Sequence, residues 1–309
     1  MIQERLKALR AEMEKRGITV YVVPTADFHE SEYVGDHFKA RKFITGFTGS
    51  AGTAVITLDE AGLWTDGRYF VQAENQLKDS TVTLYRMGEE GVPTVDEFVK
   101  DRLKEGGCLG FDGRVVNGTW GGKLEKIAAE KNVSMHVTED LIDLIWEDRP
   151  ALSKQPLFIL EEKYSGKSTA DKIADLRKAM KENGADVHIL TSLYDIAWLL
   201  NIRGNDIDYV PVVLSYLVLN ETECIWFLQE EVVDDKIRAY LEENHITTKP
   251  YDAIYDYVPE IPADAVVLMN RGTVNYRIVN SLDKAIKVVD KPNPTELMKA
   301  VKNKTEVDN

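Results

Sequence analysis

Residue types that often carry chemistry are scarce in this sequence. The two cysteines, Cys108 and Cys224, stand far apart in apolar surroundings, which predicts buried free thiols. Basic residues are also in deficit: 52 acidic against 38 basic side chains give a formal net charge of -14, with no clustered basic run. This balance excludes nucleic acids and anionic membranes as expected partners, because both need basic patches.

Long hydrophobic runs are absent as well. No apolar stretch approaches the roughly 18 residues that a membrane span needs, and the first residues, Met1 to Arg5, lack the apolar core of a signal peptide. We therefore expect a cytoplasmic protein. The composition is ordinary for a globular protein, with 44% hydrophobic and 29% charged residues. A length of 309 residues allows about two domains.

One order of elements occurs twice along the chain. Apolar spacing predicts a helix followed by a strand in each half: helix 3–15 with strand 20–23, and helix 169–182 with strand 187–190. Each helix ends at a glycine, Gly17 or Gly184, and these are 167 residues apart (184 minus 17). Duplication of one unit predicts two domains of similar architecture.

Each half continues with further strands and helices. The predicted strands are 54–58, 63–65, 109–112, 212–219, 224–227 and 265–269, and the predicted helices are 94–103, 120–131 and 236–243. Because hairpin and crossover connections both occur, we expect an α/β fold in which each domain is a mixed sheet flanked by helices. A stiff linker with two prolines, residues 148–156, separates predicted domains 1–155 and 156–309.

Three glycines at a spacing of three residues, Gly46, Gly49 and Gly52, form the most distinctive motif. A phosphate-binding loop would run into a helix, whereas here a β-branched run over 53–58 predicts a strand. The sequence around Ser50 also lacks the first glycine of a nucleophile elbow, because Thr48 occupies that position. We interpret the motif as a tight turn that needs glycine for its backbone conformation or for close approach.

A second short motif, Asp66-Gly67-Arg68, follows a predicted strand. It could direct a carboxylate or a cation at a ligand. We favour the structural interpretation, in which Asp66 bonds the backbone of a turn and Arg68 pairs with it or packs on an aromatic ring.

No convincing catalytic set is found among the five histidines. His188 lies in an apolar strand and is predicted to be a core residue. Residues 29–37 form the one metal-like cluster, with His29, His37 and several carboxylates, but the two histidines lack the i, i+4 spacing of helical metal ligands. We favour a solvated acidic loop there, and we predict no catalytic and no metal-binding residue in this chain.

The polar loop over residues 203–209 leaves two interpretations open. Arg203, Asp206 and Tyr209 place a cation, a carboxylate and a phenol between apolar strands, which is where ligand contacts are often placed. The same residues could equally serve the loop's own structure.

Several segments together resemble the first two domains of three-domain Xaa-Pro aminopeptidases (aminopeptidase P). They are Pro24 and residues 29–33 (HESEY), 44–54 (ITGFTGSAGTA), 64–70 (WTDGRYF), 145–150 (IWEDRP), 195–206 (DIAWLLNIRGND) and 211–216 (PVVLSY). The match covers nearly the whole chain in the right order. It implies that both domains have the creatinase/prolidase N-terminal fold, whose sheet topology is ribonuclease-H-like.

The resemblance also implies what is missing. In this family two aspartates, a histidine and two glutamates hold two divalent metal ions, commonly manganese, in a C-terminal pita-bread domain, and the catalytic histidines lie there too. Residues 300–309 resemble the entry to that domain, so we expect a fragment of a larger enzyme, inactive alone. The parent would remove the N-terminal residue from peptides with proline second, using a metal-bridging hydroxide.

The expected partners of the chain are then its own catalytic domain, the peptide substrate and a second subunit of a homodimer. The two N-terminal domains would shape the cleft and help assembly, and Arg203, Asp206 and Tyr209 would face that cleft. One alternative is a non-catalytic peptide- or protein-binding module on the same fold. Another is a stand-alone α/β enzyme that uses residues 29–37.

Overall fold

The computed structural model describes residues 1–309 and divides them into two compact units. Unit 1 comprises residues 1–28 and 36–151, and unit 2 comprises residues 29–35 and 152–309. The change at residue 151 lies inside the segment 148–156 in which a linker was predicted. The assignment of residues 29–35 to unit 2 is a difference from the predicted domain 1–155 and has no signal in the sequence.

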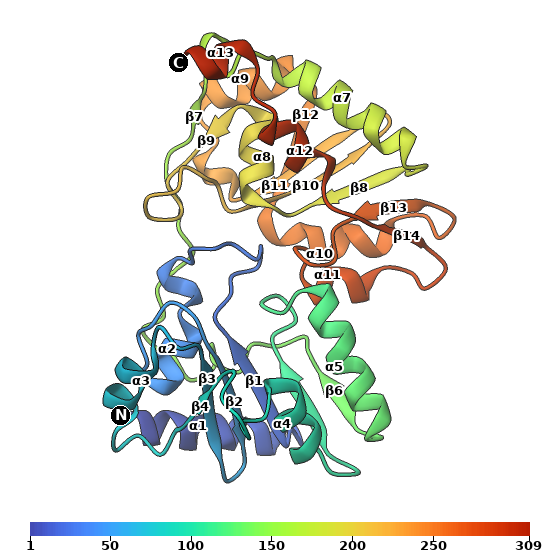
Figure 1. The fold of residues 1–309 in the computed structure, drawn as a ribbon. Coiled ribbons are helices and arrows are strands. Elements are labelled where there is room, and N and C mark those ends of the chain that lie inside the picture. Colours follow the sequence, from blue (N-terminus) through green and yellow to red (C-terminus); the bar gives the residue numbers. More distant parts are fainter. The chain divides into compact units, whose positions relative to one another are not determined.

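Unit 1 contains a six-stranded mixed sheet (Figure 1). Its strands are β1 (Val20–Pro24), β2 (Thr53–Thr57), β3 (Ala61–Thr65), β4 (Thr83–Arg86), β5 (Cys108–Phe111) and β6 (Ser134–His136). They lie in the order β4-β3-β2-β1-β5-β6. The β1–β2 and β2–β3 pairs are antiparallel, whereas β3–β4, β1–β5 and β5–β6 are parallel.

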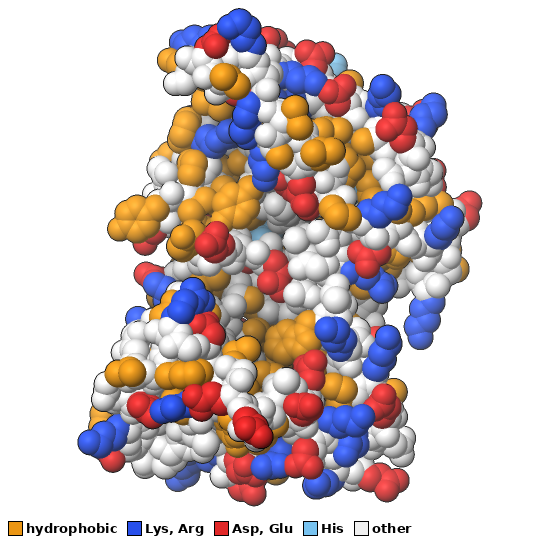
Figure 2. Space-filling view, viewed as in Figure 1, with side chains coloured by type: hydrophobic (Ala, Val, Ile, Leu, Met, Phe, Trp, Pro, Cys, Tyr) orange, Lys and Arg blue, Asp and Glu red, His pale blue; other side chains and the backbone are white.

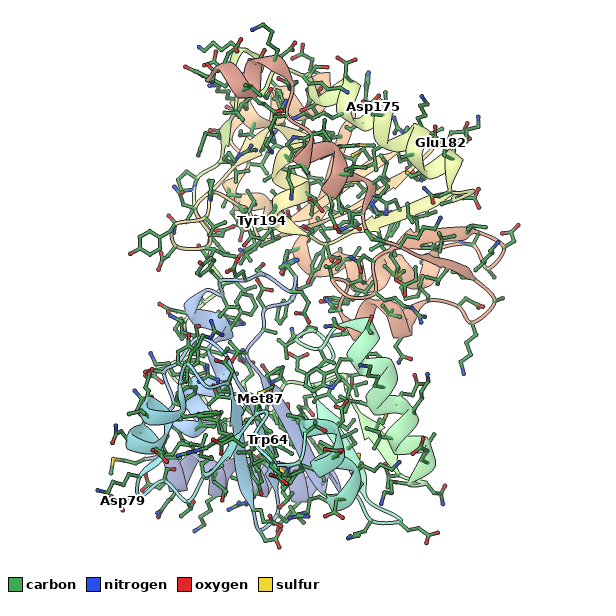
Figure 3. All side chains as sticks on the ribbon, in the orientation of Figure 1. Trp64, Asp79, Met87, Asp175, Glu182 and Tyr194 are labelled. Atoms are coloured by element: carbon green, nitrogen blue, oxygen red, sulfur yellow. The ribbon has the colours of Figure 1, made fainter.

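The helices of unit 1 bury one apolar face each. They are α1 (Ile2–Lys15), α2 (Ala40–Thr45), α3 (Phe70–Leu77), α4 (Val95–Arg102) and α5 (Gly118–Glu130), with a short 3-10 turn at Asp36–Phe38. In α1 the buried residues are Leu6, Leu9 and Met13, which recur every three to four residues as an amphipathic helix requires. Trp64 of β3 is fully buried and stacks on Tyr85 at 4.1 Å between ring centroids (Figure 3).

Unit 2 contains a second six-stranded mixed sheet with the order β12-β11-β10-β8-β13-β14. Its strands are β8 (Val187–Leu190), β10 (Ser215–Asn220), β11 (Cys224–Leu228), β12 (Ile246–Pro250), β13 (Val266–Met269) and β14 (Lys287–Asp290). The β8–β10 and β10–β11 pairs are antiparallel, and β11–β12, β8–β13 and β13–β14 are parallel. Strand order and direction therefore repeat those of unit 1 strand for strand.

The duplication expected from the sequence is confirmed by this topology. Helices α1 and α7 (Thr169–Glu182) have 14 residues each and begin 167 residues apart (169 minus 2). Strands β1 and β8 begin 167 residues apart as well (187 minus 20). The predicted fold class, two similar α/β units with mixed sheets, is confirmed.

Unit 2 has additional short helices, turns and strands. Its helices besides α7 are α6 (Glu162–Ser165), α8 (Leu193–Leu200), α9 (Asp235–Glu243), α10 (Ile254–Tyr257), α11 (Tyr276–Ser281), α12 (Pro294–Ala300) and α13 (Lys304–Asp308), with 3-10 turns at Glu230–Val232, Tyr251–Ala253 and Val258–Glu260. Two short strands, β7 (Phe158–Ile159) and β9 (Ile202–Arg203), pair antiparallel apart from the main sheet.

Some elements differ from their predicted limits. The strand predicted over 212–219 begins at Ser215, because residues 212–214 are bonded to the preceding loop: the N–H of Asp206 donates to the Val212 carbonyl. The helices α2 and α8 have no counterpart among the predicted helices, since short buried helices and buried strands have the same composition. None of the helices is long and apolar enough to cross a membrane.

Candidate functional site

The glycine-rich segment after α2 surrounds a buried cation. Nε of Arg41 donates to Oγ1 of Thr25 at 2.9 Å, and its two terminal nitrogens donate to the carbonyl oxygens of Phe47 and Gly49. The guanidinium also lies 4.7 Å from the centre of the Phe47 ring. All three acceptors are uncharged, so burial lowers the pKa of Arg41 to about 10. The segment therefore binds a side chain of its own unit through its carbonyl groups.

Each glycine of this segment is needed for a different structural reason. Gly46 adopts a left-handed conformation, φ 77°, and ends α2. A Cβ atom on Gly49 would lie 2.2 Å from the Phe47 ring, and one on Gly52 would lie 2.9 Å from the carbonyl oxygen of Trp64. The chain then enters β2 and not a helix, so the motif does not have the geometry of a phosphate loop.

The Asp66-Gly67-Arg68 motif forms a local ion pair. Oδ1 of Asp66 accepts from the N–H of Arg68 at 3.1 Å and from its Nε at 2.8 Å, and Oδ2 accepts from Nη2 at 2.9 Å. Hydrogen bonding from Arg68 lowers the pKa of Asp66 to about 2. Arg68 also lies 5.2 Å from the ring centre of Tyr69. Because Arg68 is exposed, this pair contributes little stability.

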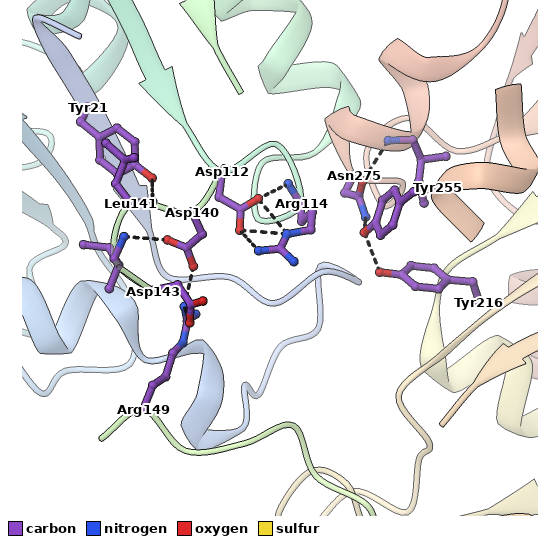
Figure 4. Close-up of polar contacts among 12 residues, drawn as sticks. Tyr21, Asp112, Arg114, Asp140, Leu141, Asp143, Arg149, Tyr216, Tyr255 and Asn275 are labelled. Atoms are coloured by element: carbon purple, nitrogen blue, oxygen red, sulfur yellow. Dashed lines mark hydrogen bonds and ion pairs between the residues drawn. The ribbon is translucent and has the colours of Figure 1, made fainter. Parts of the chain in front are cut away.

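A buried carboxylate network in unit 1 was not predicted, although Arg149, one of its members, lies in the segment 145–150. Asp112 follows β5 and accepts two hydrogen bonds from Nε of Arg114, at 3.0 and 3.2 Å (Figure 4). Oδ2 of Asp140 accepts from Nη1 of Arg149 at 2.6 Å, and Oδ1 accepts from the N–H of Ile142 at 2.9 Å. Both carboxylates are buried. Burial and then the charge of Asp112 raise the pKa of Asp140.

The two carboxylates line a recess at the carboxyl ends of β1 and β5. Its other lining residues include Tyr21, Pro24 and Phe38. The crevice outside the carboxyl ends of parallel strands is a common ligand position in α/β folds. Here, however, Arg114 and Arg149 neutralise both carboxylates, and the N–H of Leu141 donates to the Tyr21 hydroxyl at 3.0 Å. The network is an internal ion-pair system of unit 1.

The predicted metal-like cluster is not assembled by the fold. His29 belongs to unit 2, where its Nδ1 donates to the Thr191 carbonyl at 3.1 Å and its Nε2 lies 2.6 Å from the Tyr251 hydroxyl. His37 belongs to unit 1, where its Nδ1 lies 2.7 Å from the Pro150 carbonyl. Nowhere in residues 1–309 do three or more histidine, cysteine or acidic side chains lie so as to hold one metal ion.

His188, Cys108 and Cys224 were predicted to be buried. His188 is fully buried, its Nδ1 lies 3.0 Å from the Leu268 carbonyl, and burial lowers its pKa to about 4, so the ring is neutral. Its Nε2 has no hydrogen-bond partner. Cys108 and Cys224 are buried free thiols, as predicted.

The loop that contains Arg203, Asp206 and Tyr209 divides these residues among different contacts. Asp206 is buried, and its two oxygens accept from the N–H groups of Gln155 at 3.1 Å and Leu214 at 2.9 Å. Burial raises the pKa of Asp206. Asp206 thus holds the loop in place from inside unit 2 and does not present its carboxylate to solvent.

Arg203 and Tyr209 differ in exposure. Nη1 of Arg203 donates to the carbonyls of Ala197 and Ile202, which closes the C-terminal end of α8, and burial lowers the pKa of Arg203. Tyr209 is fully exposed and has φ 65°, a conformation that costs a bulky residue energy. No hydrogen bond joins Arg203, Asp206 and Tyr209 to one another, so the three do not form a single constellation in this unit.

A buried lysine, which the sequence analysis did not single out, lies near Arg203. Nζ of Lys172 donates to the Trp198 carbonyl at 2.8 Å and to Oδ1 of Asn201 at 2.7 Å. Burial lowers the pKa of Lys172 to about 8. The pattern of α7 predicts the buried face on which this lysine lies, but it does not distinguish a buried ammonium from one that extends to solvent.

Comparison with known protein families gives two matches that together span nearly the whole chain. Both are described as the creatinase/prolidase N-terminal domain, one over residues 5–145 and the other over residues 148–306. The two matches correspond to the two repeated halves.

Individual relatives share one described activity. A probable Xaa-Pro aminopeptidase P of Sordaria macrospora is 39% identical over 99% of this chain and 52% of that protein. The protein of the same description from Neurospora crassa is 38% identical over 99% of this chain and 46% of that protein. The chain therefore spans about half the length of these relatives.

A solved structure matches the whole chain. It is the X-prolyl aminopeptidase of Caenorhabditis elegans, described as a cytosolic enzyme with a di-nuclear active site, at 31% identity and a TM-score of 0.93. The match covers 100% of this chain and 52% of that one.

Proposed function

Because this chain belongs to the creatinase/prolidase N-terminal domain family, we propose that its two units form the non-catalytic N-terminal portion of a metal-dependent Xaa-Pro aminopeptidase. One observation carries the proposal: the fold agrees with an X-prolyl aminopeptidase at a TM-score of 0.93 over the full chain, yet accounts for 52% of that enzyme. The chain likewise accounts for 52% of the Sordaria macrospora relative.

The parent protein would release the first residue of peptides that carry proline second. Two divalent ions, manganese by the family resemblance, would be held in the half that follows this chain. The residues present here do not fit a dimetal site, because no cluster of three potential ligands occurs, and no step of the reaction is assigned to them. We further propose a cytoplasmic homodimer as the parent, as the family resemblance implies.

Within this function, the loop after β9 is the part proposed to meet the substrate cleft. Asp206 would act as a positioning residue, because its carboxylate binds the N–H groups that fix the loop. Tyr209 would supply the contact, since its ring is fully exposed at the end of the loop. Arg203 would hold the base of the loop against α8.

The test compares this 309-residue chain with the complete polypeptide encoded by the same gene. Each is assayed on an Xaa-Pro-Xaa peptide with added manganese. We expect turnover from the complete polypeptide and none from the 309-residue chain. Turnover by the shorter chain alone would contradict the non-catalytic role, and no turnover by either would favour a peptide- or protein-binding module.

The loop is tested in the complete polypeptide by Tyr209→Ala, with Arg238→Ala as a control at another exposed position of unit 2. We expect Tyr209→Ala to lower kcat/KM by about tenfold with unchanged metal content, and the control to leave it unchanged. Arg203→Ala should also raise KM or lower kcat/KM. If Tyr209→Ala had unchanged kinetics on several peptides, this would contradict the proposal that the loop meets the substrate cleft.

A further inference from the structure

One buried side chain attaches the segment 29–35 to unit 2. The segment lies between β1 and α2 in the sequence, yet it belongs to unit 2 and contains no helix or strand. His29 is 2% exposed, whereas residues 30–35 are exposed or half-buried. Figure 2, in which histidine side chains are pale blue, shows only small areas of that colour on the face in view. The ring of His29 is therefore the buried part of the segment.

This ring lies at the edge of the second sheet where its parallel strands end. Thr191 directly follows β8, and Tyr251 directly follows β12. Tyr216 belongs to β10, which pairs with β8. All three residues are buried. A crevice outside the carboxyl ends of parallel strands is a common ligand position in α/β folds. In unit 2 the side chain of His29 occupies this position.

Contacts on both ring nitrogens and on one ring face fix the orientation of His29. Nδ1 lies 3.1 Å from the Thr191 carbonyl, and Nε2 lies 2.6 Å from the Tyr251 hydroxyl. A carbonyl oxygen only accepts, so Nδ1 carries the proton, and Nε2 of the neutral ring then accepts from the tyrosine. The centroids of the His29 and Tyr216 rings are 4.5 Å apart. The crevice therefore matches an imidazole in shape and in hydrogen bonding.

The walls of the crevice are also held by contacts in which His29 takes no part. The rings of Tyr216 and Tyr251 stack with their centroids 4.9 Å apart. The Tyr216 hydroxyl lies 3.0 Å from the Tyr255 hydroxyl, which accepts from Nδ2 of Asn275 at 3.3 Å (Figure 4). We therefore expect the crevice to keep its shape when the imidazole is removed.

We propose that Thr191, Tyr216 and Tyr251 form a binding site for an imidazole ring, and that the chain fills this site with its own His29. The site offers one acceptor and one donor, which a neutral imidazole matches with one N–H and one bare nitrogen. A phenyl ring offers neither group, and an ammonium group cannot accept. In this site His29 acts as a pin, because its ring holds a segment that starts and ends in unit 1.

The first test removes the ring and then supplies it from solution. His29→Gly should lower the Tm of the 309-residue chain by about 4 °C or more. Imidazole at about 10 mM and about pH 8, where it is mostly neutral, should restore at least about half of the loss, because it binds the native state. No rise in the Tm of His29→Gly with imidazole would overturn the proposal.

Two controls separate the site from a general effect of imidazole. The wild-type chain has its site filled and should not respond. His245→Gly changes an exposed histidine of unit 2 that has φ 56°, a conformation that glycine adopts readily, and it should not respond either. An equal rise in Tm for His29→Gly and either control would overturn the proposal.

Amide hydrogen exchange tests whether the ring pins the segment. His29→Gly should speed exchange over residues 30–35 by at least about tenfold, because the segment loses its buried anchor. Imidazole should not slow this exchange again, since a free ring fills the site without holding the chain. Unchanged exchange over residues 30–35 in His29→Gly would show that the ring is not the pin.

A milder variant covers the case in which His29→Gly does not fold. Tyr251→Phe keeps the stacked ring and removes the hydroxyl that donates to Nε2 of His29. It should speed exchange over residues 30–35 by about threefold or more. Tyr257→Phe, at a tyrosine outside the site, should leave that exchange unchanged. Equal rates for the two variants would overturn the proposal. None of these measurements depends on peptidase activity.

Discussion

Nζ of Lys172 lies 2.7 Å from Oδ1 of Asn201 in the core of unit 2. Asn201 ends α8 in a left-handed conformation, φ 51°, and its Nδ2 donates to the Lys167 carbonyl at 2.9 Å. Lys172 also binds the Trp198 carbonyl, which lies at the end of α8 and also accepts from the N–H of Asn201. A cation at the C-terminus of a helix interacts favourably with the helix dipole. The buried ammonium thus connects α7 to α8.

Burial of Lys172 makes the stability of unit 2 depend on alkaline pH. Its pKa is about 8 in the fold against 10.5 for an ordinary lysine, so between these values the unfolded chain binds more protons than the native one. The contribution of Lys172 to the free energy of unfolding therefore rises as pH increases from about 8 to about 10.5. Lys172→Met should remove this increase, as measured by urea unfolding at several pH values. If the free energy of unfolding of Lys172→Met still rose with pH as in the wild type, this result would contradict the role given to Lys172.

The control for that experiment lies on the same helix. Lys178 of α7 is exposed, and Lys178→Met should keep the alkaline increase. The charge of Glu306 raises the pKa of Lys172, so Glu306→Gln should lower that pKa further and move the start of the increase to lower pH.

Arg41→Lys should destabilise unit 1 although it keeps the charge. A lysine cannot reproduce the three directed donors that reach Thr25, Phe47 and Gly49. We expect a loss of about 1–3 kcal/mol in the free energy of unfolding, since buried carbonyl groups lose their donors. Lys42→Arg, at the exposed neighbouring position, should change it by less than about 0.5 kcal/mol. Equal effects of the two variants would show that the directed contacts are unimportant.

Gly49→Ala and Gly67→Ala test which glycines the turns need. A Cβ atom at Gly49 would lie 2.2 Å from the Phe47 ring, whereas the nearest atom to one at Gly67 is 3.8 Å away. We expect Gly49→Ala to cost about 2 kcal/mol or more through overpacking, and Gly67→Ala to cost less than about 1 kcal/mol. Thermal unfolding of the 309-residue chain measures both. If Gly67→Ala lost more stability than Gly49→Ala, close packing would not be the reason that the turn at Gly49 needs glycine.

A double-mutant cycle measures the buried pair Asp140–Arg149. Removing Asp140 alone leaves the guanidinium of Arg149, whose side chain is 7% exposed, without its main partner. Asp140→Ala should therefore cost about 3 kcal/mol, and the cycle with Arg149→Met should give a coupling energy above about 1 kcal/mol.

The exposed pair Lys100–Glu130 provides the comparison. Its side chains are 51% and 58% exposed, so its cycle should give at most about 0.5 kcal/mol. Coupling of the same size in both pairs would mean that burial adds nothing at Asp140.

Local patterns in the sequence were sufficient to predict the range of an element where one of its faces is buried. The helices α1 and α7 and the strands β1 and β8 agree with their predicted ranges within one residue, because their apolar spacing matches the helix or strand period. Helices α2 and α8 were not predicted, and β10 begins at Ser215 and not at residue 212, since tertiary hydrogen bonds and packing set the ends of these short elements. Local patterns did not predict strand order, because pairing partners are far apart in the chain, and only the family resemblance implied a sheet topology.

For polar groups too, the sequence predicted a contact between near neighbours in the chain but not contacts between distant segments. The sequence identified Asp66 and Arg68 as a candidate turn pair, and their 2.8 Å contact spans two residues. It gave no signal for Asp140 with Arg149 as a buried pair, or for Lys172 with Asn201, because charge and burial come together only after distant segments pack. Likewise it grouped His29 with His37, which the fold assigns to different units.

The sequence by itself determined that the chain is a duplicated α/β protein whose motifs resemble those of Xaa-Pro aminopeptidase N-terminal domains. These properties are local or repeated, so periodicity and motif order suffice to recognise them. Only the tertiary structure decided which charges are buried and which loop residues reach solvent. Burial is a property of packed neighbours, and those neighbours are chosen by the whole fold.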